Sequence, residues 1–400
     1  MEWIYWLMVM VPVAVLGVVK AVGTAIMAGR MRGVEELALG EEEREEVQRL
    51  WGGARLLVLV NPLGGNGAGL LSYRRCVEPT LKGLGIGHVL VLTERKGHAR
   101  EVVERLPAES PYEAVLCVGG DGLVHEALNG LMLRRGALGL RPEDAPALCH
   151  IPAGTGNGIA VGLGLGKHPA EALRRALKKG PAGRMVDVIR VRQEMGDNVE
   201  RVEWSLMSFN YGLVAEGDNL TENTLRWTGW LRELLAPVYL LARARRIRGR
   251  LSFEPAEAHF DPQSLLGQLR FLDGLQRDEE GRCVLEGPVF YLIGSSLSHI
   301  AHDIHCTPLA APDDGCLDAL LQTSNDRLSA VSLFLSADKG VSLPALKRSG
   351  ARYLKMRSVS ITPIDPPCGS PQVVFSTDGE ILPTAPTTAT VLPSACRVIA

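Results

Sequence analysis

Residues 114–132 place an apolar segment, a glycine turn and a helical pattern in direct succession, and this order constrains the fold more than any other stretch. The apolar run 114–118 predicts a buried strand, and apolar side chains at helical spacing over 127–132 predict a helix. Gly119, Gly120 and Gly122 lie between them and lack Cβ atoms, so the backbone can approach a large anion closely. Because the start of a helix also presents free N–H groups, the stretch predicts a phosphate-binding unit.

Asp121 stands inside this turn, where a carboxylate would repel a phosphate group. A carboxylate beside a phosphate can accept the proton of an attacking hydroxyl group or act through a magnesium ion. We therefore predict Asp121 as the catalytic base, with a simple helix N-cap as the alternative. His98 and His125 are weaker candidates for a base, because packed or capping histidines are more frequent.

Three further stretches combine an apolar strand with a polar turn. The run 56–60 leads into residues 61–69, which hold four glycines in nine residues, and another glycine turn follows at 150–158. Near the end of the chain, an apolar run at 373–375 leads into the turn 378–380. The glycine pattern at 61–69 fits neither a Walker loop nor the dinucleotide-binding spacing, so the class of nucleotide site is left open by the motif alone.

Taken together and in this order, the four motifs resemble the diacylglycerol kinase catalytic superfamily, and in particular its sphingosine (sphingoid long-chain base) kinase branch. The resemblance covers residues 54–382 and includes the connecting pieces 92–100 and 248–251. It implies ATP and Mg²⁺ as cofactors. The nucleotide contacts that it implies are Asn61, Pro62, Leu63, Gly64, Gly65, Thr93, Glu94, Arg95, Lys96, Gly97, Glu126, Gly154, Thr155, Gly156, Arg226, Arg232, Asp378, Gly379 and Glu380. The lipid contacts that it implies are Gly119, Gly120, Asp121, Gly122, Ser208 and Asp218.

The reaction that the resemblance implies is phosphorylation of the primary hydroxyl group of sphingosine and related sphingoid long-chain bases, giving sphingosine 1-phosphate. Asp218 would distinguish the substrate class, because a carboxylate can bind the ammonium and secondary hydroxyl groups of such a base, whereas diacylglycerol carries no cation. A loop aspartate without function is the alternative. Arg226 and Arg232 would hold the transferring phosphate, with a solvated helix face as the alternative. Thr93 could instead be a helix N-cap.

Other functions remain open at this point. A kinase for diacylglycerol, ceramide or another lipid of the same superfamily would share the nucleotide motifs, and NAD kinases and phosphofructokinases share the Gly-Gly-Asp-Gly pattern. A catalytically weak lipid-binding or scaffold protein is the alternative from a different class. Phosphoryl transfer activity would separate a kinase from a scaffold.

The first 33 residues predict a membrane anchor. Residues 3–19 carry no charge, and the basic residues Lys20, Arg30 and Arg32 follow or interrupt the apolar segment. The positive-inside rule would keep the remainder of the chain on the cytoplasmic face of the membrane. The alternative is an apolar helix that packs on the protein itself. Residues 34–53 are predicted as a charged helical spacer.

Alternating strand and helix patterns over residues 54–186 predict an α/β domain with a parallel, doubly wound sheet. The strands are expected near 56–60, 88–92, 114–118, 147–151 and 185–191, with helices at 98–106, 123–134 and 168–179. Residues 187–400 predict a lipid-binding, mainly antiparallel β-sandwich, with a variable surface insertion near 254–287 and a helix over 328–339. The nucleotide cleft is expected between the two domains, at the carboxyl ends of the parallel strands.

Composition limits the partners. A net charge of −2 does not favour binding to nucleic acid, and eight cysteines without a Cys-x-x-Cys pair indicate neither a disulfide framework nor a zinc site. The expected partners are a sphingoid base and a membrane lipid surface, and a homodimer is left open.

Apolar residues over 225–241 followed by five arginines over 243–250 predict either a buried helix pair or a gate for a lipid tail that touches anionic membrane.

Overall fold

The computed structural model describes residues 37–196, 199–220, 247–256, 271–324, 326, 333, 340–342, 346, 348–364 and 375–400. Three predictions lie outside the described residues: the membrane anchor 1–33, the segment 221–246 with Arg226 and Arg232, and nearly all of the helix predicted over 328–339. Among the helices that are described, none is both long and apolar enough to cross a membrane.

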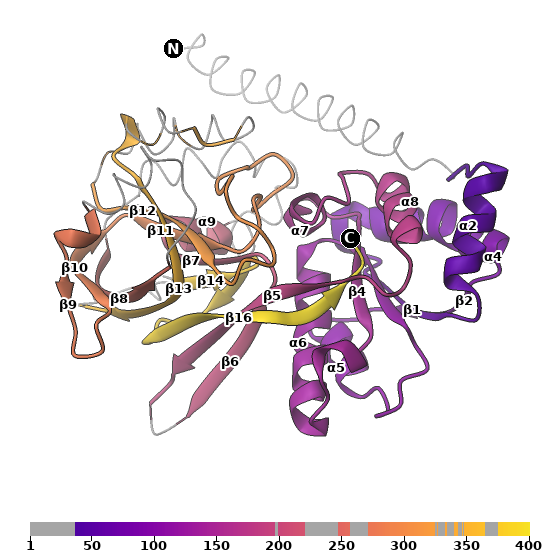
Figure 1. The fold of residues 1–400 in the computed structure, drawn as a ribbon, viewed down its shortest axis with the longest axis horizontal. Coiled ribbons are helices and arrows are strands. Elements are labelled where there is room, and N and C mark those ends of the chain that lie inside the picture. Colours follow the sequence, from indigo (N-terminus) through magenta and orange to yellow (C-terminus); the bar gives the residue numbers. More distant parts are fainter. Residues whose placement is uncertain are drawn as a thin grey trace, which may run out of the picture.

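The first lobe contains the predicted parallel sheet, on the right in Figure 1. Its strands are β1 (Arg55–Val60), β2 (Gly87–Leu92), β3 (Ala114–Gly119) and β4 (Ala147–Pro152), which pair in the order β4-β3-β1-β2. All three pairings are parallel. The continuous apolar runs in β1, β3 and β4 are buried along nearly their whole length, as expected for strands that are covered on both faces.

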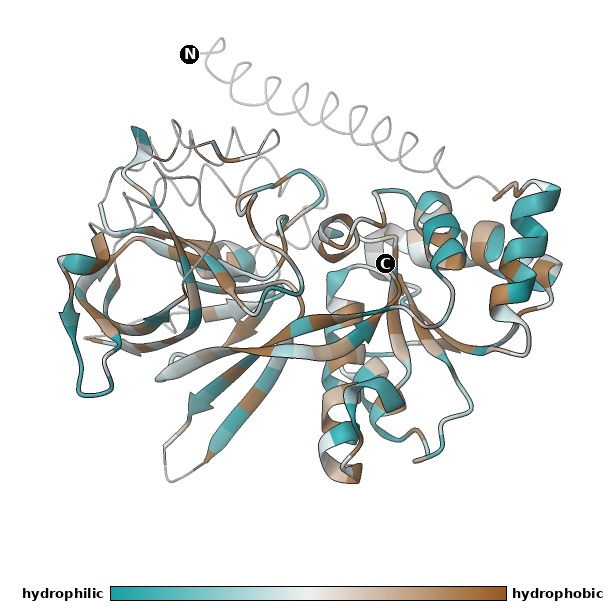
Figure 2. Ribbon diagram, in the orientation of Figure 1, coloured by the Kyte–Doolittle hydropathy of each residue, from teal (hydrophilic) through white to brown (hydrophobic). Residues whose placement is uncertain are grey.

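Helices cover both faces of this sheet. One face packs against α2 (Glu41–Trp51), α4 (Glu78–Leu84) and α8 (Pro169–Lys179), and the other against α5 (His98–Glu104) and α6 (Asp121–Leu138). Alternate residues of β1 divide between the two cores, because successive side chains of a strand point to opposite faces. Figure 2 shows the hydrophobic residues gathered on the strands and the inner helix faces. The doubly wound α/β fold is therefore confirmed.

Five short elements complete the described part of the first lobe. A 3₁₀ turn covers Gly64–Gly67, helix α3 covers Ala68–Ser72, and one π-helical turn at Tyr73–Val77 leads into α4. A second 3₁₀ turn covers Pro142–Asp144, and the short helix α7 covers Gly158–Gly162.

The second lobe is built from antiparallel strands, as predicted. They are β5 (Arg184–Glu194), β6 (Glu200–Ser205), β7 (Ser208–Gly212), β8 (Ile247–Pro255), β9 (Gln276–Arg277), β10 (Cys283–Val289), β11 (Tyr291–Ser295), β12 (Leu317–Gln322), β13 (Arg352–Pro363), β14 (Phe375–Thr377), β15 (Glu380–Leu382) and β16 (Thr387–Val398). Their buried side chains divide mainly between two hydrophobic cores of the second lobe, and the ends of β5 and β16 that reach the first lobe contribute to a core there. Helix α9 (Leu213–Asn219) follows β7 directly.

Two long strands join the lobes. The predicted boundary between residues 186 and 187 falls inside β5, which pairs with β16 over most of its length. Strand β16 also pairs with β4 of the first lobe and with β13 of the second (Figure 1). Asp187 fixes this junction, because its carboxylate accepts N–H groups from Gly315 at 2.6 Å and from Ser394 at 2.9 Å. The lobes are thus connected through strands rather than through a flexible linker.

The segment 254–287, which the sequence predicts as a surface insertion, begins and ends within the second sheet. Strand β8 continues to Pro255, and β10 begins at Cys283, whose side chain is buried opposite Phe253. Between these strands the described residues include the exposed turn 278–281. A local excess of charged residues marked this turn but did not reveal the strands beside it.

Candidate active site

Three glycine turns meet at the carboxyl ends of β1, β3 and β4. A side chain at Gly154 would collide with the Cα atom of Gly120, and a Cβ atom at Gly156 would lie 2.9 Å from a carboxylate oxygen of Asp121. Asn157 holds the third turn closed: its side chain accepts the N–H group of Gly154 at 2.9 Å and donates to the Gly154 carbonyl at 2.9 Å. Glycine is required here because two backbones approach each other directly.

We expect Gly154→Ala to weaken nucleotide binding. The added methyl group forces the turns at Gly120 and Gly154 apart, and overpacking of this kind costs roughly 1–3 kcal/mol. Calorimetric titration with Mg-ATP, together with thermal unfolding, measures both effects. The matched control is Gly136→Ala within α6, where a Cβ atom would meet nothing within 4 Å. Equal nucleotide affinity in both variants would contradict the required close approach of the turns.

Asp121 is the first residue of α6, and its side chain points to the neighbouring turn rather than to its own helix. Its two carboxylate oxygens accept the N–H groups of Gly158 at 3.1 Å and Ile159 at 2.9 Å. Gly120 occupies the N-cap position, so the alternative that Asp121 is a simple N-cap is not supported. The side chain is 11% exposed, and this burial raises its pKa despite the two N–H donors. A carboxylate with a raised pKa is a stronger base.

The first turn is organised by Asn61. Its side-chain oxygen accepts the N–H groups of Leu63 and Gly64, both at 3.0 Å, while the Leu63 side chain is 81% exposed. Thr93 follows β2 and is buried: its N–H group donates to the carbonyl of Val60 at 2.9 Å, at the same edge of the sheet. Gly97, not Thr93, is the N-cap residue of α5, so the alternative role for Thr93 is not observed.

The residues of the predicted motif 94–97 differ in their partners. Arg95 pairs with Glu101 at 2.7 Å, the Glu94 N–H group donates to His98 at 3.1 Å, and Lys96 pairs with Glu380 of the second lobe. Lys96 and Glu380, two predicted nucleotide contacts, are therefore brought together by an ion pair between the lobes.

Glu126, another predicted nucleotide contact, has its hydrogen-bond partners within the first lobe. Its carboxylate oxygens accept the N–H groups of Gly97 at 2.8 Å and Ala99 at 3.1 Å, at the start of α5. A carboxylate at a helix start is stabilised by the free N–H groups there. Glu126 thus fixes α5 against α6 and positions the turn that carries Lys96.

Asp378 is buried and anchors the second lobe rather than facing the cleft. Its carboxylate accepts the Ser205 hydroxyl at 2.6 Å and the N–H groups of Leu206, Met207 and Ser208 at 3.2, 3.1 and 2.9 Å. Its side chain is 0% exposed. The predicted nucleotide contact of this side chain therefore needs correction: tertiary packing turns the carboxylate inward, while the next two residues, Gly379 and Glu380, continue the turn toward Lys96.

His125 bridges two buried acids. Its Nδ1 atom lies 3.0 Å from Asp378, and its Nε2 atom lies 3.9 Å from Glu203, which also pairs with Arg100 at 3.3 Å and Arg201 at 3.2 Å. Burial lowers the pKa of His125, but the hydrogen bond to Asp378 and the charges of Asp378, Glu380 and Glu203 outweigh it, so the pKa is raised. Both ring nitrogens face protein groups, which supports a packing role over a base role.

The raised pKa predicts a pH-dependent contribution to stability. A group whose folded-state pKa is raised stabilises the protein fully below its unfolded pKa of 6.5, and this stabilisation is lost as pH rises through the folded pKa. We expect His125→Gln to lower the free energy of unfolding more at about pH 6 than at about pH 9, as measured by urea denaturation. His168→Gln, at an exposed position, is the control. A loss of unfolding free energy that does not change with pH would contradict a charged His125 between Asp378 and Glu203.

A row of buried hydroxyl and amide groups leads from Asp378 to Asp218. The side-chain nitrogen of Asn210 lies 3.4 Å from the Ser208 hydroxyl and 3.3 Å from the Ser376 hydroxyl. The Ser376 hydroxyl in turn donates to Asp218 at 2.5 Å. The two predicted lipid contacts, Ser208 and Asp218, are thus brought into one polar row, and Ser376 is a member that the sequence did not indicate.

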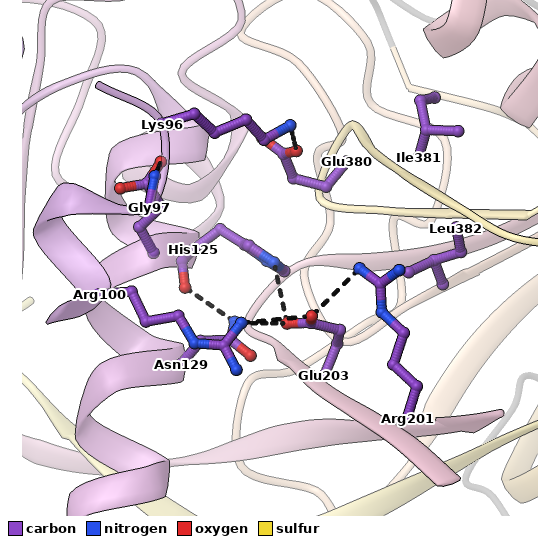
Figure 3. Close-up of a pocket in the computed structure, with 11 residues that line it drawn as sticks. Lys96, Gly97, Arg100, His125, Asn129, Arg201, Glu203, Glu380, Ile381 and Leu382 are labelled. Carbon is purple, nitrogen blue, oxygen red and sulfur yellow. Dashed lines mark hydrogen bonds and ion pairs between the residues drawn. The ribbon is translucent and has the colours of Figure 1, made fainter. Parts of the chain in front are cut away.

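A cavity of about 150 Å³ opens between α5, α6 and the second lobe (Figure 3). Its lining residues are Lys96, Gly97, Arg100, His125, Glu126, Asn129, Arg201, Glu203, Glu380, Ile381 and Leu382. Four of them, Lys96, Gly97, Glu126 and Glu380, are predicted nucleotide contacts. Asn129 also joins the lobes, because its amide nitrogen donates to Trp204 at 2.8 Å while its oxygen accepts the Trp204 N–H group at 3.0 Å.

Comparisons with known proteins agree with this arrangement. Residues 55–191 match the diacylglycerol kinase catalytic domain, and residues 289–400 match the YegS C-terminal NAD kinase beta sandwich-like domain. A putative diacylglycerol kinase from Bacillus anthracis has the same fold, with a TM-score of 0.59 and 21% identity, over 87% of this chain and 95% of that one. The chain is therefore similar to the diacylglycerol kinase catalytic superfamily in its first lobe, and it is a kinase.

Among known enzymes, the chain is similar to several that are named for sphingoid bases. It is 28% identical to sphingoid long chain base kinase 4 of Schizosaccharomyces pombe, over 83% of this chain and 72% of the relative. It is 29% identical to sphingosine kinase 1 of Mus musculus, over 82% of this chain and 86% of the relative. Sphingosine kinase 1 of Homo sapiens is 34% identical over 50% of this chain and 52% of its own length, so that alignment spans about half of the human enzyme.

Proposed function

We propose that this chain is an ATP-dependent lipid kinase that phosphorylates the primary hydroxyl group of sphingosine and related sphingoid long-chain bases. The observation that carries the proposal is the position of Asp218, which is tied through Ser376, Asn210 and Ser208 to the buried anchor Asp378 of the second lobe. A carboxylate there fits the cationic head of a sphingoid base, and it would have no cation to bind in a diacylglycerol. The names of the relatives support the same substrate class.

The three glycine turns fit the phosphates of ATP. Side chains at Gly120, Gly154 and Gly156 would fill the space between the turns. Because these side chains are missing, an anion can approach the backbone N–H groups directly. Mg²⁺ would supply charge neutralisation on the phosphate oxygens. We propose that Asn61, Gly64, Gly154 and Thr155 hold the phosphates, that Lys96 and Glu380 close over the nucleoside, and that Arg226 and Arg232 reach the transferring group.

Asp121 would accept the proton of the lipid hydroxyl as its oxygen attacks the γ-phosphorus. Each carboxylate oxygen has two acceptor positions, and one on each is taken by the N–H groups of Gly158 and Ile159. The remaining positions can face the lipid hydroxyl. The same N–H groups fix the direction of the carboxylate, and positioning of this kind supplies much of the catalysis in phosphoryl transfer.

Asp218→Asn is expected to weaken lipid binding selectively. Loss of a charge-assisted hydrogen bond costs roughly 1.5–3 kcal/mol, so KM for sphingosine should rise by roughly 10-fold to 100-fold while KM for ATP stays near the wild-type value. Initial rates with each substrate varied in turn measure the split. Ser376→Ala removes the hydroxyl donor to Asp218 and one acceptor for Asn210 but keeps the carboxylate, and it should have a smaller effect in the same direction. An unchanged KM for sphingosine in Asp218→Asn would exclude the ammonium contact.

We also propose that residues 1–33 attach the catalytic lobes to the cytoplasmic face of a membrane. The uncharged run at 3–19 and the basic residues that follow it support the proposal. Deletion of residues 1–33 should release the protein from vesicles in a flotation assay without abolishing transfer to sphingosine in detergent. Continued flotation of the shortened chain would contradict the anchor.

The central test is transfer of labelled phosphate from Mg-ATP to a panel of sphingosine, dihydrosphingosine, phytosphingosine, ceramide and diacylglycerol. Product from the free bases alone would support the proposed substrate class. Product from diacylglycerol or ceramide instead would retain the kinase and discard Asp218 as the group that recognises the substrate.

A further inference from the structure

His150 lies beside the turn that carries Gly119 and Asp121, and among the described residues one of its ring nitrogens has no hydrogen-bond partner. It is the fourth residue of β4, and its side chain is 1% exposed. Its Nε2 atom lies 3.0 Å from the carbonyl oxygen of Gly119. Its Nδ1 atom is buried, lies 3.9 Å from Oδ1 of Asp121, and has no hydrogen-bond partner among the residues that the structure describes.

The partner of Nε2 fixes the form of the ring. A carbonyl oxygen can only accept, so Nε2 must carry a hydrogen atom, and in the neutral ring Nδ1 then carries a lone pair. Burial lowers the pKa of His150 and therefore favours the neutral ring. A lone pair of Nδ1 thus faces the carboxylate of Asp121. Two acceptors that face each other are stabilised when one proton enters between them.

We propose that His150 is a positioning residue that holds the proton which Asp121 takes from the lipid hydroxyl. The proposal rests on the proposed phosphoryl transfer. In that step the O–H bond of the lipid breaks and its oxygen bonds to the γ-phosphorus. The bond from this phosphorus to the bridging oxygen breaks, and its electron pair stays on ADP. The proton moves to Asp121, whose new O–H group donates to Nδ1 of His150. A neutral His150 that accepts this bond favours the protonated form of Asp121, whereas a charged His150 would lower the pKa of Asp121.

Few other titratable groups face this pair. On the elements packed against it, Asp378 raises the pKa of Asp121 further through its negative charge. His302 contacts the third turn: its backbone N–H group donates to the Gly156 carbonyl at 2.7 Å, and its Nδ1 atom lies 3.2 Å from the same oxygen. Cys117 pairs in register with His150, and Cys149 precedes it; burial raises the pKa of both thiols, so both stay neutral. Asp121 is thus the carboxylate to which Nδ1 is directed.

Two variants separate proton holding from support of the Gly119 carbonyl. In His150→Gln, the side-chain nitrogen of glutamine can take the place of Nε2 and keep the bond to Gly119, but no acceptor remains at the position of Nδ1. In His150→Asn, the side-chain oxygen of asparagine can take the place of Nδ1, but the variant loses the bond to Gly119. We expect His150→Gln to lower kcat by roughly 10-fold to 100-fold, a part of the usual effect of general base catalysis. In this variant kcat/KM should fall at a lower pH on the acid side of its pH profile than in the wild-type enzyme. In His150→Asn the fall should return to the wild-type pH.

Wild-type kinetics in His150→Gln, or a larger loss in His150→Asn than in His150→Gln, would overturn the proposal. A readout without lipid or activity is the long-range ¹H–¹⁵N spectrum of the histidine rings in the wild-type protein. We expect His150 as a neutral ring with its hydrogen on Nε2, and a changed Nδ1 shift in Asp121→Asn. A hydrogen on Nδ1, or no response to Asp121→Asn, would overturn the proposal even if the variants do not fold. Absence of transfer to sphingosine by the wild-type enzyme would instead contradict the proposed function.

Discussion

Replacement of Asp121 by asparagine is expected to lower phosphoryl transfer to sphingosine by roughly 10²-fold to 10⁴-fold, the usual range for loss of a general base. The asparagine side chain has nearly the same shape, and its oxygen can still accept one of the N–H groups of Gly158 and Ile159. Its NH₂ group cannot accept the other N–H group and cannot take up a proton at neutral pH. The rate of labelled phosphate transfer at saturating substrates measures the effect.

Two controls separate lost chemistry from a displaced turn. Calorimetry with Mg-ATP should show near wild-type affinity in Asp121→Asn if the third turn keeps its position, and thermal unfolding should show a folded protein. Turnover within roughly 10-fold of the wild-type value would be too high for loss of the base and would remove Asp121 from this role. Loss of ATP affinity in parallel with turnover would indicate that Asp121 acts chiefly by holding the third turn.

Asp378→Ala is expected to be the most destabilising of the substitutions considered. It leaves the Ser205 hydroxyl, the N–H groups of residues 206–208 and the ring of His125 without their shared acceptor inside the protein. Removal of one partner from a buried ionic network costs roughly 3–5 kcal/mol, a large share of the stability of an ordinary domain. Urea denaturation measures the loss, and KM should rise for both ATP and sphingosine, since Glu380 and Ser208 flank the anchor.

Asp378→Asn is the matched control. Its oxygen can accept part of the same set, and asparagine tolerates the backbone angle φ of 49° at this position. We expect an intermediate loss of stability. If Asp378 contacted the nucleotide directly, as the sequence motif predicts, Asp378→Asn would instead weaken ATP binding at unchanged stability. That result would overturn the anchor role.

The sequence by itself determined the parts of the fold that depend on local preferences. Continuous apolar runs in β1, β3 and β4 predicted strands buried on both faces, because only a sheet covered on both sides needs no polar alternation. Glycine turns after these strands predicted that the turns meet at one edge of the sheet, since the carboxyl ends of parallel strands lie there, and the structure brings the three turns together. The base role of Asp121 stays a prediction, which follows from the position of its carboxylate within a glycine turn.

Only the tertiary structure decided the roles of residues whose partners are far away in the chain. Asp378 and Glu126 belong to motifs that predict nucleotide contact, yet both carboxylates accept N–H groups from distant segments, over separations of 170 and 29 residues. His150 is an unremarked strand residue until β3 and β4 pair and bring Asp121 above it. Local patterns report the preferences of a few neighbouring residues, whereas the partner of a buried charge is set by which strands and helices pack together.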